Sequence, residues 1–219
     1  MPPQSASLLL PTHPFDATDN KNIFCSILRT SLGEQAWRKL SPEIVSRFNA
    51  HLSEAHSMQF VGRMHWVYCS PIGALIAKII KPFSILPDIC TREADFLFSI
   101  AVRNGVIMKQ RVYQLSDKHR FVLTSRFADQ PRLHEEFGGG IGMYLSLAVK
   151  RGAMLFRDCG YFIRLRNWCI RLPRILTVGH FELMHRNIDE QRFQIIIRVA
   201  HPWLGTLFYQ RGVFRQIGD

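Results

Sequence analysis

A histidine and a glutamate lie two residues apart in one extended segment of the sequence. His180 and Glu182 share a face of an alternating stretch, with Met184 beyond them. A histidine oriented by a carboxylate is a typical general base, and His201 could join the pair if its own segment lay alongside. Because no nucleophile motif accompanies the pair, a solvent-facing or purely structural contact is the simpler alternative. Catalytic residues therefore stay unassigned.

Glu135 interrupts an apolar face. It alternates with Leu133 and Phe137, which predicts a carboxylate that points inward. A buried carboxylate costs several kcal/mol unless a cation accompanies it. We predict Arg126 or Arg63 as its partner, in a structural ion pair or as a polar anchor inside a pocket.

Other polar side chains alternate with apolar ones in the same manner. In a strongly curved sheet they could line one cavity, whereas on an outer face they would form simple cross-strand pairs. The candidate ligand-binding residues are Arg63, His65, Glu135, His180, Glu182, Tyr209 and Arg211.

Two motifs resemble known sites without matching them. Residues 134–138 read HEEFG, in which Gly138 replaces the second histidine of a zinc-protease motif, and the segment is extended rather than helical. Residues 138–142 read GGGIG, but Leu145 occupies the place of the third glycine of a dinucleotide loop. We therefore expect a bend between strands there, and neither a metal site nor a cofactor.

The elements that must position these residues are mostly β-strands. Short connections such as Asn104-Gly105 and Arg151-Gly152 require antiparallel neighbours. One strand is expected from Gln59, and beyond residue 93 the expected strands are 95–103, 106–114, 119–126, 132–137, 143–151, 153–158, 161–165, 177–185, 192–201 and 206–214.

Helical spacing precedes the strands. Residues 23–52 are expected to be helical, with a start signal at Ser41-Pro42, and a further helix is expected over 70–81. We predict an α+β fold: a strongly curved antiparallel sheet or partly closed β-barrel of about nine strands, covered by two or three N-terminal helices. Residues 1–22 are expected to form a loose arm before a single globular domain at 23–219, with helices mostly at 23–82 and strands mostly at 93–215.

Composition narrows the class of protein. The chain has 219 residues, a formal charge of +11, and 47% hydrophobic residues. These values exclude a mainly disordered chain, and the positive charge favours an anionic partner. Five cysteines without a CxxC pair argue against a zinc ribbon, and the N-terminal residues do not resemble a secretory signal, so we expect a cytoplasmic protein.

Four groups of residues carry a family resemblance over about residues 35–215. They are LSPEIVSRFNAH at 40–51; FVGRM at 60–64 through Leu86-Pro87; Arg120-Phe121 with LHEEFG at 133–138; and a C-terminal run that includes IRLP at 170–173, HPWLG at 201–205 and YQRG at 209–212. Together they resemble a bacterial domain family of unknown function, whose members occur alone or C-terminal to saccharopine-dehydrogenase-like oxidoreductase domains. The resemblance implies a stand-alone domain and a functional association with an oxidoreductase, and it implies no catalytic residues.

These observations favour a binding module. The main hypothesis is a domain that holds a small apolar or amphipathic ligand, with an anionic group as one option, in the concave side of its sheet. The alternatives are an acid–base isomerase or cyclase that uses His180 and Glu182, and a basic accessory domain that contacts an anionic lipid surface. We do not expect nucleic acid as a partner, because the arginines alternate with aromatics along strands rather than cluster in a tail.

Overall fold

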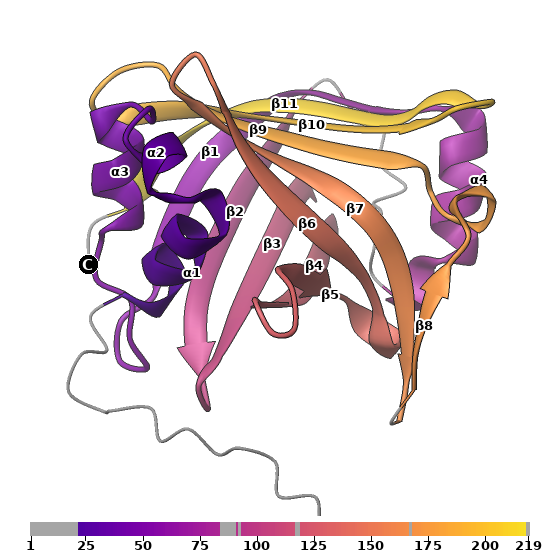
Figure 1. Cartoon of the computed structure of the whole chain (residues 1–219). Coiled ribbons are helices and arrows are strands. Elements are labelled where there is room, and N and C mark those ends of the chain that lie inside the picture. The colour runs from indigo at the N-terminus through magenta and orange to yellow at the C-terminus, as the bar shows by residue number, and fades with distance from the viewer. Residues whose placement is uncertain (1–21, 84–90, 92, 117–118, 167, 218–219) are drawn as a thin grey trace, which may run out of the picture.

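A closed antiparallel barrel forms the body of the molecule (Figure 1). The structure is a computed structural model that describes residues 22–83, 91, 93–116, 119–166 and 168–217; the expected arm at 1–22 lies outside them except for Asn22. Within this part of the chain, ten strands close the barrel in the order β6-β5-β4-β3-β2-β1-β11-β10-β9-β7, with β7 pairing back onto β6. The expectation of about nine strands in a partly closed sheet is thus close in number, and closure is complete.

The strand bounds follow the predicted segments closely. They are β1 (Met58–Cys69), β2 (Ala94–Arg103), β3 (Val106–Ser116), β4 (His119–Ala128), β5 (His134–Glu136), β6 (Ile141–Lys150), β7 (Ala153–Leu165), β8 (Trp168–Leu172), β9 (His180–Asn187), β10 (Arg192–His201) and β11 (Gly205–Ile217). The two segments expected at 153–158 and 161–165 form the single strand β7. The unexpected β8 pairs only with the second half of β7, beside the barrel.

A bulge in β1 changes which side chains point inward. The pairing with β11 skips one residue between Met64 and Trp66. Phe60 and Met64 face the interior before the bulge, and Val67 is buried after it. The sequence predicts unbroken alternation here, with Met64 and Trp66 on one face, and this prediction is wrong because a bulge reverses the alternation.

Three short helices cover one end of the barrel (Figure 1). They are α1 (Ile23–Leu32), α2 (Glu34–Trp37) and α3 (Pro42–Phe48), so the helical segment expected at 23–52 is broken into pieces. Gly33, with a φ of 82°, separates α1 from α2. Phe24 of α1 and Phe48 of α3 reach into the core, where the Phe24 ring meets that of Phe127 at 5.3 Å.

The helix α4 (Pro71–Ile79) lies at the opposite end of the barrel. Its start follows the predicted pattern, because the Ser70 hydroxyl oxygen accepts a hydrogen bond from the Gly73 N–H at 3.0 Å. No helix in the described part of the chain is long and apolar enough to cross a membrane. At Gly138–Gly140 the chain makes a 3₁₀ turn between β5 and β6, which confirms the expected bend.

Candidate functional site in the barrel interior

Three charged side chains meet inside the barrel. Lys109 and Arg111 point inward from β3, and Glu135 points inward from β5. Arg111 Nη2 lies 2.6 Å from Glu135 Oε1, and Lys109 Nζ lies 3.4 Å from Oε2. The hydroxyl of Ser125, on the intervening strand β4, donates to the same carboxylate and accepts from Arg111. Both oxygens of the Glu135 carboxylate therefore have a hydrogen-bond or ion-pair partner.

This charged cluster is ionised despite its burial. Burial alone would raise the pKa of Glu135, but the charges of Arg111 and Lys109 and the hydrogen bonds from Ser125 and Arg111 outweigh it and lower the pKa to about 2. Burial lowers the pKa of Lys109 to about 8, against the opposing attraction of Glu135. Near neutral pH the cluster holds two cations and one anion, so the barrel centre is positive.

An amide on the facing wall completes the polar centre. Gln210 of β11 is only 1% exposed. Its Oε1 accepts a hydrogen bond from the Tyr113 hydroxyl at 2.6 Å, and its Nε2 has no hydrogen-bond partner among the described residues. Burial raises the pKa of Tyr113, so the phenol stays protonated and holds the amide in this orientation. An unpaired buried donor is costly, and it is therefore a place where a ligand acceptor would be stabilised.

Another buried polar contact connects helix α3 to strand β9 of the barrel. Arg47 of α3 donates from Nη1 to Nε2 of His185 on β9 at 3.1 Å, and from Nη2 to Asn187 Oδ1 at 3.1 Å. Its guanidinium also lies 4.3 Å from the centre of the Phe193 ring. Burial, with a further contribution from Arg47, lowers the pKa of His185 to about 3, so the ring is neutral and Nε2 accepts.

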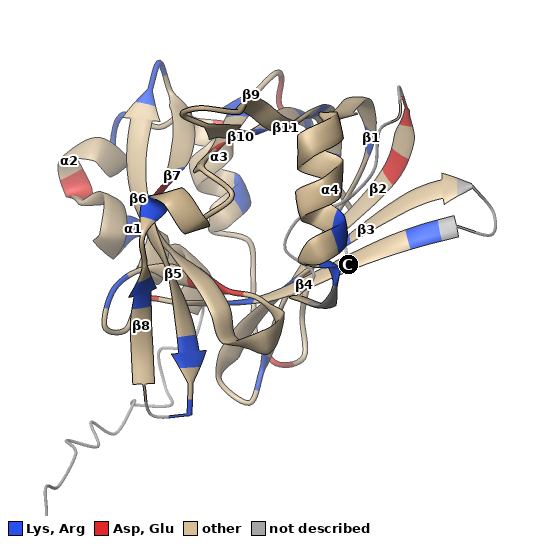
Figure 2. Ribbon diagram, turned by 90° about the vertical axis from the view of Figure 1, so that its right-hand side faces the viewer, with Lys and Arg blue, Asp and Glu red and all other residues tan. Residues whose placement is uncertain are grey.

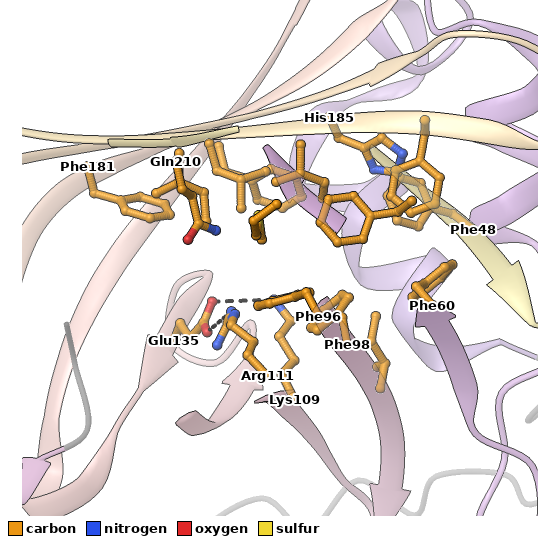
Figure 3. Close-up of a pocket in the computed structure, with 18 of the residues that line it drawn as sticks. Phe48, Phe60, Phe96, Phe98, Lys109, Arg111, Glu135, Phe181, His185 and Gln210 are labelled. Carbon is orange, nitrogen blue, oxygen red and sulfur yellow. Dashed lines mark hydrogen bonds and ion pairs between the residues drawn. The ribbon is translucent and has the colours of Figure 1, made fainter. Parts of the chain in front are cut away.

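Two adjoining cavities surround the charged cluster. One of about 70 Å³ extends toward helices α1 and α3, and one of about 60 Å³ extends toward the α4 end of the barrel. Arg111 and Glu135 line both cavities. Figure 3 shows Gln210 reaching toward Glu135 and Arg111 across the open space. Aromatic rings form most of the remaining wall of the larger cavity: Phe24, Phe48, Phe60, Phe96, Phe98, Phe156, Phe181, Phe193 and Phe214.

Of the seven candidate residues, the structure places only Glu135 at these cavities. Its inward direction agrees with the alternation of residues 133–137. The partners predicted for it are wrong: Lys109 and Arg111 accompany it instead of Arg126 or Arg63, because β4 brings β3 and β5 together.

The other candidates lie outside the cavities. Arg63 pairs with Glu93 at 2.8 Å, and His65 is exposed at the β1 bulge. Tyr209 and Arg211 flank the inward Gln210 and thus face outward. A shared cavity for these residues, which the curved sheet made possible, is not formed.

His180 and Glu182 are not joined to each other. His180 Nδ1 lies 3.7 Å from Asp158 Oδ1, and Glu182 pairs with Arg157 at 2.7 Å. His201 is buried, and its Nδ1 accepts from the Trp203 backbone N–H at 3.3 Å, which is a local turn contact.

Sequence reasoning missed Lys109, Arg111 and Gln210. A signal for them exists, because Lys109 and Arg111 alternate with Ile107 and Tyr113, both of which are buried. A cation at an inward position of such an apolar alternation predicts a buried and paired charge, as the pattern around Glu135 does.

These features define a class of protein: a closed antiparallel β-barrel with an aromatic lining and a positively charged polar centre. The chain belongs to the DUF4166 family, described as a domain of unknown function, whose model matches residues 40–214. The comparison with curated proteins found no match. The family resemblance noted in the sequence is thereby confirmed as far as a domain of unknown function; bacterial origin and association with an oxidoreductase stay predictions.

Proposed function

We propose that this protein binds a small carboxylate-bearing molecule inside its barrel. The observation that carries the proposal is the buried Nε2 of Gln210, which has no hydrogen-bond partner in the described part of the chain and faces the Arg111 and Lys109 cations across a cavity. A ligand carboxylate in this space would accept from the amide and offset the surplus positive charge.

The wall of the cavities supports an apolar remainder for this ligand. Phenylalanine rings favour an aromatic or compact aliphatic body over a sugar or a nucleotide. Each cavity is about half of the roughly 150 Å³ of a protein cavity known to bind benzene. A molecule of the size of benzoate therefore requires rotation of some lining rings, and a longer chain would require more.

Glu135 has a defined part in this proposal. It holds Arg111 and Lys109 in place when the cavity contains no anion, and it leaves one positive charge uncompensated. The acid–base alternative has less support, since neither His180 nor Glu182 lines the two cavities.

The test combines an unbiased search with a defined probe. Native mass spectrometry before and after denaturation would detect a co-purified acid. Calorimetric titration with benzoate should show binding, while the uncharged benzyl alcohol of similar size should bind at least about tenfold more weakly, as expected for the loss of a charge-assisted hydrogen bond.

A matched pair of variants locates the binding. Gln210→Met keeps the volume, removes the unpaired donor and should weaken benzoate about tenfold. Gln194→Met is the control, because Gln194 is equally buried but does not line the two cavities. Equal affinity of benzoate and benzyl alcohol, or an unchanged affinity in Gln210→Met, would contradict the proposal.

A further inference from the structure

Large apolar side chains project into solvent at the α4 end of the barrel. Trp203 is 74% exposed in the β10–β11 turn, Leu176 is 72% exposed in the 3₁₀ turn before β9, and Ile79 is 68% exposed on α4. We call the exposed apolar side chains of these three segments the apolar rim: Ile72, Leu75, Ile79, Ile175, Leu176, Trp203 and Leu204. Single exposed apolar residues are ordinary, but seven at one end of a barrel are not.

The three segments adjoin one another. Gly179, just after the 3₁₀ turn, packs against the backbone of Ala200 and His201, at the start of the β10–β11 turn. Gly73 of α4 packs against the backbone of Leu207, just after that turn. Figure 2 looks onto this end, with α4 toward the viewer. The rim is therefore a connected surface built from one helix and two turns. The β7–β8 hairpin, with its exposed Trp168, extends from the same end.

Basic side chains accompany the rim. Lys78 lies on α4, Lys81 follows it, and Arg174 opens the 3₁₀ turn. Arg166 and Arg171 belong to the β7–β8 hairpin and its connection. None of these five forms an ion pair with an acidic residue in the described ranges, whereas Glu136 and Glu182 are already paired with Arg164 and Arg157.

We propose that the α4 end of the barrel binds the surface of an anionic lipid bilayer. Exposed tryptophan and aliphatic side chains on projecting turns insert into the interfacial region of a bilayer, and nearby lysine and arginine attract anionic headgroups. The net charge of +11 acts in the same direction. Six of the seven rim residues are isoleucine or leucine on turns and a helix, which suits acyl chains better than the flat stacking of bases.

The site has a geometric relation to the barrel interior. The cavity of about 60 Å³ is lined by Val178 and Phe208, which lie directly beside the 3₁₀ turn and the β10–β11 turn. Bilayer binding does not depend on the ligand proposal, but it would bring the cavity close to a source of amphipathic acids.

Vesicle flotation with the full chain tests this inference. We expect the protein to float with vesicles of equal parts phosphatidylcholine and phosphatidylserine, and not with phosphatidylcholine alone. Added salt should weaken binding, because headgroup attraction is screened within about 10 Å at 0.1 M ionic strength. The double variant Leu176→Ser, Trp203→Ser should bind at least about tenfold more weakly, and Lys78→Gln with Arg174→Gln about tenfold more weakly.

Matched controls lie at the other end of the molecule. Ile188→Ser removes an exposed apolar side chain from the β9–β10 turn, and Lys39→Gln with Arg103→Gln removes the same charge; all should bind like the parent protein. Failure of the parent to float with anionic vesicles, or equal loss in the controls, would overturn the proposal. So would a dimer, seen by light scattering, that the rim variants dissociate while vesicles bind nothing, because the rim would then join two copies. The rim variants should bind benzoate like the parent protein, because none of the substituted residues lines the two cavities. This titration therefore separates the two proposals.

Discussion

Replacement of Glu135 by glutamine should destabilise the fold more than replacement of any neighbouring carboxylate. Glu135 compensates Arg111 and Lys109, both of which are enclosed with it in the barrel. Removal of one partner from a buried ion pair costs about 3–5 kcal/mol, because the remaining charge stays in a medium of low polarity. That cost is a large share of the free energy of unfolding of a typical domain, which is roughly 5–15 kcal/mol.

The assay is urea unfolding near pH 7, followed by circular dichroism. The control is Glu136→Gln, one residue away, whose carboxylate pairs with the exposed Arg164 at 3.0 Å and should be worth under about 1 kcal/mol. If Glu135→Gln lost no more free energy of unfolding than Glu136→Gln, the view of the cluster as a buried and mutually dependent unit would be refuted.

The pH dependence gives a second check on the same residue. Because the pKa of Glu135 is lowered from 4.5 to about 2, its contribution is complete above pH 4.5 and is lost as the pH falls to about 2. The difference in unfolding free energy between the parent and Glu135→Gln should therefore shrink over that interval. A difference that stays constant down to pH 2 would show that the carboxylate is not held ionised.

Further predictions concern the rest of the fold. Because the pKa of His185 is lowered from 6.5 to about 3, the unfolded chain takes up a proton first, and stability should fall by up to about 5 kcal/mol as the pH drops between these values; His185→Gln should lose this slope in urea titrations. Gly62→Ala should cost at least about 2 kcal/mol in the same assay, since the new Cβ would lie 2.2 Å from the Val213 carbonyl oxygen; a neutral result would mean that β1 and β11 can separate there. Ser41→Ala should change stability by less than about 0.5 kcal/mol, because its buried hydroxyl makes no cap bond, whereas Ser70→Ala should cost about 1 kcal/mol; the reverse order in thermal unfolding would contradict this assignment.

Much of the barrel could be predicted from local patterns. The bounds expected at 192–201 coincide with β10, and those at 95–103 differ from β2 by one residue. Strand β8 was missed because almost all its side chains are exposed, so it shows no alternation between buried and exposed positions. The β1 bulge was missed because it depends on the partner strand β11, which lies more than a hundred residues further along the chain.

The candidate site was harder to predict for the same physical reason. The inward direction of Glu135 follows from alternation within its own strand. Its partners depend on strand order, and β3 reaches β5 only across β4. Gln210 does not stand out in the local sequence. It becomes notable only because Tyr113 bonds to its amide oxygen, while its amide nitrogen has no partner among the residues that the structure describes.

The position of β11 between β1 and β10 has a consequence for how the chain folds. Gln59 pairs with Ile217 on β11, which joins β1 to β10. Among the described strands, the rest of the wall is already continuous through β6 and β7. During synthesis, β1 and β10 must each keep a bare edge until β11 has left the ribosome, and contacts of such long sequence separation form slowly. Bare strand edges also favour aggregation. Loss of β11 would therefore cause more than a local defect, because it would leave an open sheet with unpaired edges on β1 and β10. Aggregation through these edges would then compete with binding by chaperones.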